Sequence, residues 1–441
     1  MFTKKALFHL IVPLVIESFL GTTIGFVGTI MVSSAGEAAV SGVSSVDNIN
    51  NLVMFFIAAL ATGGAIIIAQ YLGKGAPEEA RTTAKQLLYT TVITAAVIMT
   101  IALAGGRFLL TVIFGNMEPR VMQYARTYFV ITAVSYPFLA ITQSISAVFR
   151  SMGISKTPMF VSLLMSMVNM TVCAVLIYVF RMGVAGAATG VLVARITASA
   201  AMLILIGNRH NIVYLSRIFE LKLKPGTIKR ILKVGVPSGL DSGMFHLGRL
   251  ILQSLIVTFG TASIAANAVV GQIMNMVQIP ATAISMAIIT VIGQCVGAGD
   301  CRQAGINAKR LVKLSYMATA TLCAVAFLFS ETLFRLFNLS AEATELSRTV
   351  IMYTAIFSGL LHPLSFTLPN VLRAAGDVRF TMIVSLASMW LVRISMSYVI
   401  SRTFQLGLMS VWIAMYADWF VRSAFFLWRF VSGKWRAKQV V

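Results

Sequence analysis

The sequence has few charged residues and very few acidic ones. Only 11% of its 441 residues are charged, whereas 58% are hydrophobic and the mean hydropathy is +0.88. An average soluble protein has about 25% charged residues. Apolar runs longer than about eighteen residues, the length that a helix needs to cross a bilayer, occur many times. The scarcity of charge therefore excludes a soluble globular protein and predicts a polytopic membrane protein.

Cysteine and histidine are also scarce, with four of each. Cys173 and Cys323 lie in apolar runs, and Cys295 and Cys301 follow neither paired nor metal-ligand spacing, so disulfides and a zinc site are not expected. The sequence contains no GxxxxGK[ST] phosphate loop. It also lacks the clustered His, Asp or Cys of a membrane enzyme such as an acyltransferase. We therefore expect that the protein is not an enzyme and has no cofactor, and that H⁺ or Na⁺ serves as its coupling ion.

Apolar runs bounded by charge, Gly or Pro predict twelve membrane spans. We place them at residues 8–33, 44–72, 84–105, 121–149, 157–180, 184–207, 231–259, 264–296, 311–334, 346–372, 380–401 and 407–430. The runs are too long for the strands of a membrane barrel and lack their period-two alternation. The expected fold class is therefore an all-α polytopic membrane protein.

Two segments of the chain repeat each other. QYLGKGAPEEARTTAKQLL begins at Gln70 and QCVGAGDCRQAGINAKRLV begins at Gln294, so the offset is 294 − 70 = 224. The same offset carries Glu17 onto Asp241. A repeat this long is half of the protein. Each copy holds six spans, an even number, so both copies begin on the same side of the membrane and the repeat is parallel.

The expected domains follow from this repeat. We predict an N-terminal six-helix lobe at 1–207, a basic cytoplasmic linker at 208–230 and a C-terminal six-helix lobe at 231–441. The offset is not uniform, because Gly153 corresponds to Gly376, one residue short of 224. Two similar bundles can rock against each other around a solute held near the membrane midplane, so the composition favours a transporter.

The net charge is +21 and the pI is about 10.3. The basic residues gather in every second connection and at both termini, where the positive-inside rule predicts cytoplasm. Membrane orientation therefore explains the charge, and no nucleic-acid partner is expected. We expect a multi-pass protein of the cytoplasmic (inner) membrane, with both termini cytoplasmic.

A likeness to a known family is carried by segments in both halves of the chain. They are IVPLVIESFL, IAQYLGKG, VIGQCVGAG, VGVPSGLDSGMFHLGRLILQSL and HPLSFTLPNVLRAAGD. These segments resemble the multidrug and toxic compound extrusion (MATE) family, of bacterial type, within a larger exporter superfamily. The resemblance implies two six-helix lobes, a V-shaped cavity between them, and export of organic, often cationic, compounds by antiport with H⁺ or Na⁺. The expected partners are organic cations and the lipid bilayer, and we expect a monomer.

Two points keep alternatives open. Many family members have an aspartate in the first helix that is proposed to take up the coupling cation, whereas this sequence has Gly28 there, in FVGTIMV. Coupling must then use another acid or be altered. The nearest alternative function is a flippase for lipid-linked oligosaccharide or peptidoglycan precursors, which needs a larger, cationic cavity for pyrophosphate.

Glu17 and Asp241 are the acids that we expect to carry coupling and substrate binding. Each lies about nine or ten residues into its span, which is near mid-depth of a hydrocarbon core about 30 Å thick. A carboxylate there costs about 3 kcal/mol, so it should face the bundle interior or a watery cavity. A proton, Na⁺ or an organic cation could compete for it. A structural ion pair is the alternative, and Arg249 follows Asp241 on roughly the same helix face.

Further polar residues are candidates for the cavity wall. Asp47, Asn48 and Asn51 lie in the second span, and the repeat maps the two asparagines onto Gln272 and Asn275. This recurrence suggests amide groups offered by both lobes, with interhelical hydrogen bonds as the alternative.

The seventh span adds His246 and Arg249 as candidates. A histidine could relay protons, with simple packing as the alternative. Asp418 and Arg422 have the i,i+4 spacing of a helical ion pair, for which we expect a structural role.

Overall fold

The computed structural model describes residues 3–115, 118–216, 220, 222–337 and 339–441. Within these ranges all regular structure is helical, which confirms the expected fold class. The first half contains the helices α1 (Lys4–Ser33), α2 (Glu37–Gly73), α3 (Pro77–Phe114), α4 (Pro119–Val134), α5 (Tyr136–Ser151), α6 (Lys156–Ala174), η1 (Val175–Val179) and α7 (Gly183–Ile206).

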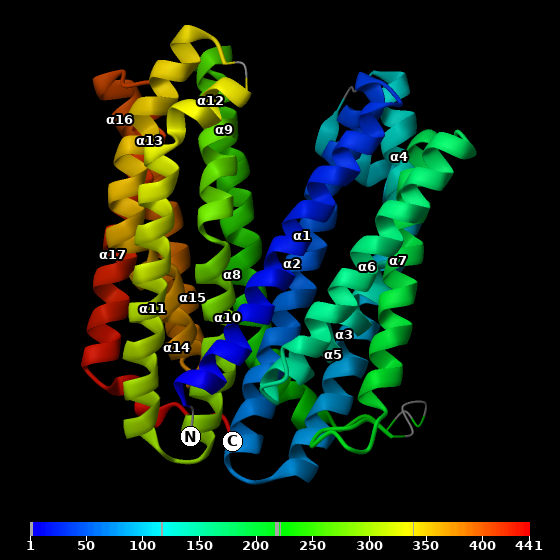
Figure 1. The fold of residues 1–441 in the computed structure, drawn as a ribbon, viewed down its shortest axis with the longest axis vertical. Helices are drawn as coiled ribbons and strands as arrows, with labels where there is room; N and C mark the ends of the chain where they lie inside the picture. Colours follow the sequence, from blue (N-terminus) through cyan, green and yellow to red (C-terminus); the bar gives the residue numbers. More distant parts are fainter. Residues whose placement is uncertain (1–2, 116–117, 217–219, 221, 338) are drawn as a thin grey trace. The chain divides into compact units, whose positions relative to one another are not determined.

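The second half repeats this pattern with more interruptions. Its helices are α8 (Pro225–Val257), α9 (Thr261–Val277), α10 (Ile279–Gly297), α11 (Cys301–Leu328), α12 (Ser330–Leu336), α13 (Ala341–His362), η2 (Pro363–Thr367), α14 (Leu368–Ala374), α15 (Val378–Ala387), η3 (Ser388–Ile394), α16 (Ser395–Phe404), α17 (Leu408–Val431) and η4 (Lys434–Ala437). Figure 1 shows α11, α13 and α17 running side by side, and α11 and α17 both pack on α13.

Each of the twelve predicted spans coincides with one helix or with consecutive helices. By length and hydropathy, nine helices of the described chain can cross a membrane, or ten if the bent pair α4 and α5 is one span. Of the others, α9 has only 17 residues, and α8 and α17 carry several charged side chains. The axis bends by 48° between α4 and α5, where Pro137 occupies the first turn of α5. Proline removes a backbone donor there, which allows the bend.

The helices group into two compact units, which we describe separately. Residues 8–239 form the N-unit, and residues 240–441 with the first seven form the C-unit, so the division falls within α8. Part of the predicted linker packs on α3 of the N-unit, because Gln86 Nε2 donates to the carbonyl of Lys222 at 2.7 Å. Residues 217–219 and 221 of that linker lie outside the described residues. The extent of the two lobes stays a prediction.

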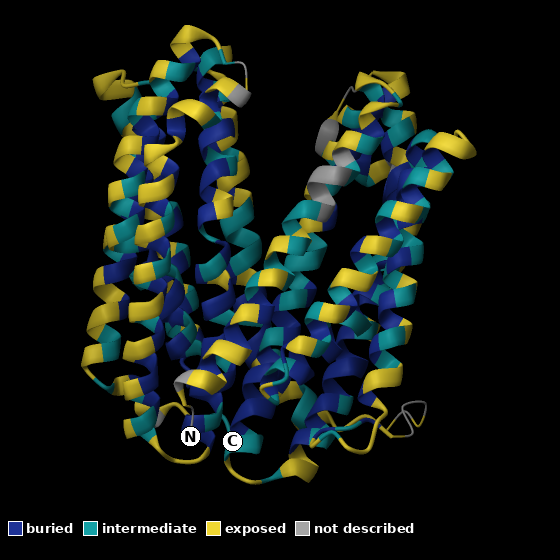
Figure 2. Cartoon of the chain, in the orientation of Figure 1, coloured by how far each residue is buried: buried dark blue, intermediate teal, exposed yellow. Residues whose placement is uncertain are grey.

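Each unit buries an apolar core, and many of the exposed positions along its helices, which Figure 2 marks, carry large apolar side chains. Ile204, Leu328 and Val431 are about three-quarters exposed, at 76%, 75% and 75%. Large exposed apolar surfaces are rare on soluble proteins but are what a helix presents to lipid. These faces agree with a multi-pass membrane protein.

Close packing within the N-unit gives the first prediction. A Cβ atom added to Gly63 of α2 would lie 2.6 Å from the backbone nitrogen of Gly235 in α8. We expect Gly63→Ala to lower the free energy of unfolding by about 1–3 kcal/mol, because the added methyl forces two backbones apart. Thermal unfolding of the detergent-solubilised full chain measures the effect.

The matched control is Gly305→Ala in α11, where an added Cβ meets nothing within 4 Å. Its unfolding midpoint should equal or exceed that of the wild type, since alanine favours helices more than glycine does. Equal midpoints for the two variants would show that the contact at Gly63 does not limit stability.

Candidate functional site

A cavity of about 370 Å³ lies inside the C-unit. Its wall is formed by side chains of α8, α9, α13, η2, η3 and α17, together with Gln278 between α9 and α10. Three candidates from the sequence line it, namely Arg249, Gln272 and Asn275. His246 and Asp241 belong to α8 as well but are not part of this wall.

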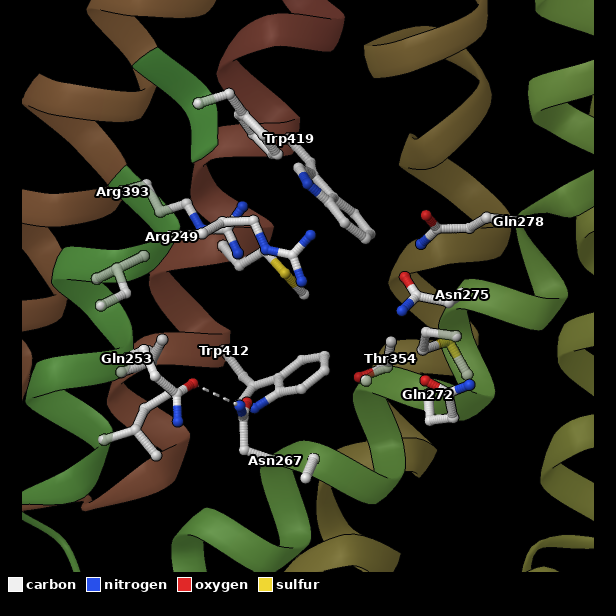
Figure 3. Close-up of a pocket in the computed structure, with 18 of the residues that line it drawn as sticks. Arg249, Gln253, Asn267, Gln272, Asn275, Gln278, Thr354, Arg393, Trp412 and Trp419 are labelled. Atoms are coloured by element: carbon white, nitrogen blue, oxygen red, sulfur yellow. Dashed lines mark hydrogen bonds between the residues drawn. The ribbon is translucent and has the colours of Figure 1, made fainter. Parts of the chain in front are cut away.

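The wall combines aromatic rings with polar groups. Trp412 and Trp419 of α17 supply the largest apolar surfaces, and both side chains are buried. Figure 3 shows the amides of Asn275 and Gln278 facing Arg249 across the cavity. Small-molecule sites have this composition, a mostly apolar lining with a few oriented polar groups, and volumes of about 300–1,000 Å³.

Arg393 is the charged cavity residue that sequence reasoning did not select. It belongs to η3, a π-helical turn between α15 and α16, and is only 8% exposed. Single π-helical turns shift the side chains that follow them around the helix axis and are frequent at functional sites. The sequence signal for Arg393 was an arginine inside an apolar span, but the span pattern did not show which way it faces.

The two acids predicted to act in coupling each form an ion pair with an arginine. In the N-unit, Arg150 Nη1 donates to Glu17 Oε1 at 2.9 Å, and both side chains are 15% exposed. In the C-unit, Arg373 Nη2 donates to Asp241 Oδ2. Glu17 and Asp241 are repeat equivalents, and so are the arginines, since the offset at this point of the chain is 223, as for Gly153 and Gly376. One ion pair therefore occurs twice.

This repeated pair joins the first helix of each unit to a later one. Glu17 on α1 binds the last turn of α5, and Asp241 on α8 binds the last turn of α14. The pairing offsets the cost of placing a carboxylate in an apolar helix. Neither acid lines the C-unit cavity, and their role in coupling stays a prediction.

The N-unit holds a second polar group around Asp47. Asn50 Nδ2 donates to Asp47 Oδ1 at 3.4 Å, and the hydroxyl of Tyr136 donates to Asn50 Oδ1 at 2.8 Å. Nearby, Arg195 Nη1 donates to Ser135 Oγ at 2.6 Å. Asp47 has no salt bridge to a Lys or Arg in the described part of the N-unit. It is therefore an interior acid without the arginine that holds Glu17.

The predicted asparagines beside Asp47 lie elsewhere. Asn48 and Asn51 are exposed, and Asn48 Nδ2 donates to the carbonyl of Ser44 one turn earlier. The buried amide beside Asp47 is Asn50, which sequence reasoning missed. Its helix is apolar on most faces, so hydropathy could not separate neighbouring positions.

Comparison with known proteins identifies the family. The MatE family model matches residues 13–175 and again 237–399, so the second match begins 224 residues after the first (237 − 13 = 224), as the sequence repeat does. The chain belongs to the MatE family. MatE proteins are transporters, and no enzymatic activity is expected of this one.

Relatives match this MatE chain over nearly its whole length. It is 27% identical over 450 residues to the probable multidrug resistance protein NorM of Thermotoga maritima, covering 99% of this chain and 94% of that one. It is 27% identical over 447 residues to the uncharacterized transporter YisQ of Bacillus subtilis, covering 98% and 95%.

Solved structures share the fold. A MATE structure in the bent conformation matches with a TM-score of 0.90 at 20% identity, covering 98% of this chain and 96% of the other. An outward-facing multidrug resistance MATE transporter matches with a TM-score of 0.89 at 20% identity, covering 97% and 96%. These likenesses support the twelve-helix MATE architecture.

The ion pair of the C-unit gives the second prediction. Asp241→Asn should lower the free energy of unfolding by about 3–5 kcal/mol, because it leaves Arg373 charged in a mostly apolar interior. Thermal unfolding of the full chain in detergent measures the loss.

The double variant Asp241→Asn/Arg373→Gln removes both charges and should recover most of that stability. If the single variant unfolds at the wild-type temperature, the pair does not stabilise the C-unit.

Proposed function

We propose that this MatE protein exports small organic compounds across the cytoplasmic membrane, driven by the inward flow of H⁺ or Na⁺. The observation that carries the proposal is the polar and aromatic cavity within the membrane-embedded C-unit. Its volume of about 370 Å³ suits a drug-sized molecule. The printed name of the Thermotoga maritima relative, a probable multidrug resistance protein, supports the same function.

The membrane potential is an adequate source of energy for this export. One positive charge moving inward across about 100 mV releases about 2.3 kcal/mol. At about 1.4 kcal/mol per tenfold ratio, this supports a gradient of roughly fifty-fold for a neutral compound. The basic connections and termini face the cytoplasm in this proposal, so the cation enters as the compound leaves.

Asp47 is the carboxylate best placed to exchange the coupling cation. Glu17 and Asp241 each form an ion pair with an arginine, although Glu17 Oε2 is buried with no partner among the described residues. Asp47 Oδ1 accepts a hydrogen bond from Asn50 Nδ2 at 3.4 Å, and Asp47 forms no salt bridge among the described residues of the N-unit. Oxygen and amide groups can stabilise a bound H⁺ or Na⁺, and the nearby Arg195 guanidinium is not bonded to the carboxylate. We therefore place the coupling cation at Asp47 in this proposal, and Glu17 is the second candidate.

The flippase alternative retains one supporting observation. The C-unit cavity contains two arginines, as a pyrophosphate site would. Its volume, however, is that of a small-molecule site, whereas a lipid-linked oligosaccharide needs far more room. We therefore prefer export of small compounds.

Transport by the purified protein in liposomes tests the function. With an imposed inward gradient of H⁺ or of Na⁺, we expect efflux of a fluorescent organic dye to exceed that of protein-free liposomes. No gradient-dependent efflux under either ion would contradict the proposal. Dependence on one ion alone would identify the coupling cation.

Replacement of Asp47 tests the coupling site. Asp47→Asn should reduce gradient-driven efflux at least about tenfold, because a neutral amide cannot compensate the charge of a bound cation. Unfolding temperature should change little, since Asp47 makes no ion pair. The control Glu79→Gln removes an exposed acid at the start of α3 and should transport normally. Full efflux by Asp47→Asn would move the coupling site to another acid.

A further inference from the structure

The cavity of the C-unit is positively charged. Arg249 of α8 and Arg393 of η3 both line it, and none of its lining residues is Asp or Glu. Figure 3 shows the two guanidinium groups on the same wall, and Arg249 acts on Arg393 as a like charge. The side chains that line the cavity therefore carry a net charge of +2.

No carboxylate of the described C-unit forms a salt bridge with these arginines, and Asp418, which pairs with Arg422, attracts Arg393 only from beyond salt-bridge distance. Each interior acid is bound by another arginine: Asp241 by Arg373, Asp377 by Arg429 and Asp418 by Arg422. The side chains of Arg249 and Arg393 form no ion pair or hydrogen bond with the described residues of the unit.

The unpaired state of Arg393 is costly in such a setting. It is 8% exposed, its Nε atom is buried without a partner among the described residues, and its guanidinium lies 5.7 Å from the centre of the Phe245 ring. A charge inside an apolar helix bundle costs several kcal/mol unless a counter-charge or water compensates it. Two like charges on one wall raise that cost further. An anion in the cavity would compensate both.

The rest of the wall restricts which anion fits. Trp412 and Trp419 present flat apolar surfaces that suit an aromatic ring. Asn275 and Gln278 face the arginines and can bind further polar groups of the same molecule (Figure 3). A guanidinium group binds a planar carboxylate through two parallel hydrogen bonds.

We propose that the C-unit cavity binds small aromatic organic acids, with the acidic group at Arg249 and Arg393 and the ring against Trp412 and Trp419. This inference rests on the proposed export function for the route by which such a compound reaches the cavity. It reverses the charge expected for the substrates of the chain, because two unpaired arginines repel organic cations.

Binding to the purified full chain in detergent tests the site without requiring transport. Three dansyl probes share one fluorophore: dansylglycine carries a carboxylate, dansylamide is neutral, and dansylaminoethyl-trimethylammonium is a cation. We expect dansylglycine to bind most tightly and the cation most weakly. Tighter binding of the cation than of dansylglycine would overturn the proposal.

Variants of the two arginines locate the binding. Arg249→Gln and Arg393→Gln should each weaken dansylglycine binding about tenfold to a hundredfold, the usual range for a lost charged hydrogen bond, and leave dansylamide binding unchanged. Arg393→Lys should recover only part of the affinity, because lysine keeps the positive charge but cannot form two parallel hydrogen bonds with a carboxylate. Wild-type affinity for dansylglycine in both Gln variants would overturn the proposal.

The matched control is Arg348→Gln, which removes a surface arginine of the same unit, with 56% of its side chain exposed. It should bind all three probes normally. If Arg393→Gln also fails to bind dansylamide, the substitution has damaged the fold. The test then rests on Arg249→Gln, because the side chain of Arg249 is exposed and lines the cavity.

Two further outcomes separate neighbouring explanations. Displacement of dansylglycine by phosphatidylglycerol nanodiscs would assign the arginines to a lipid headgroup and overturn the aromatic-acid assignment; no displacement supports it. Arginine-dependent binding without any gradient-driven efflux would contradict the export function and leave the binding site standing. Gradient-driven efflux of a neutral dye without arginine-dependent binding would support the export function and contradict the binding site.

Discussion

Charge compensation inside apolar helices is the constraint on which this structure depends. Every interior acid of the C-unit that the structure describes is held by an arginine, and so is Glu17 of the N-unit. Each pair joins side chains that would be expensive alone in a membrane. Against this background, the described interior charges without a salt bridge are the ones with chemistry to offer. They are Asp47 and the nearby Arg195 in the N-unit, and Arg249 and Arg393 in the C-unit.

The internal repeat shows which features belong to the scaffold and which differ between the units. The acid and arginine of the repeated ion pair occur in both copies, with Glu17 in one and the shorter Asp241 in the other. The unpaired charges do not repeat. The 224-residue offset places Gly271 opposite Asp47 and Gly25 opposite Arg249. The units thus share a framework but differ in their unpaired charges, which are Asp47 and Arg195 in one and Arg249 and Arg393 in the other.

The sequence predicted the fold well because length and hydropathy are local properties. Twelve runs corresponded to twelve helical spans, including those broken by Pro363 or by the bend before Pro137. Glu17 and Asp241 were found because a carboxylate in an apolar run is conspicuous. Their arginines were not assigned as partners, because these lie 133 and 132 residues away and the contact depends on tertiary packing.

The candidate site was predicted only in part, for a related reason. Arg249, Gln272 and Asn275 do line the cavity, whereas the buried amide beside Asp47 proved to be Asn50 instead of Asn48 or Asn51. In a helix that is apolar on nearly all faces, the spacing of hydrophobic residues does not show which positions face the interior. The position of Arg393 depends on a π-helical turn, which no hydropathy pattern indicates.

The sign of the unpaired charges constrains where each class of compound can bind. At an effective dielectric constant of about 20, two charges about 4 Å apart interact by about 4 kcal/mol, attractive or repulsive according to sign. An organic cation near Arg249 or Arg393 would lose affinity on that scale, and an organic acid would gain it. The C-unit cavity therefore selects compounds by the sign of their charge as well as by their shape.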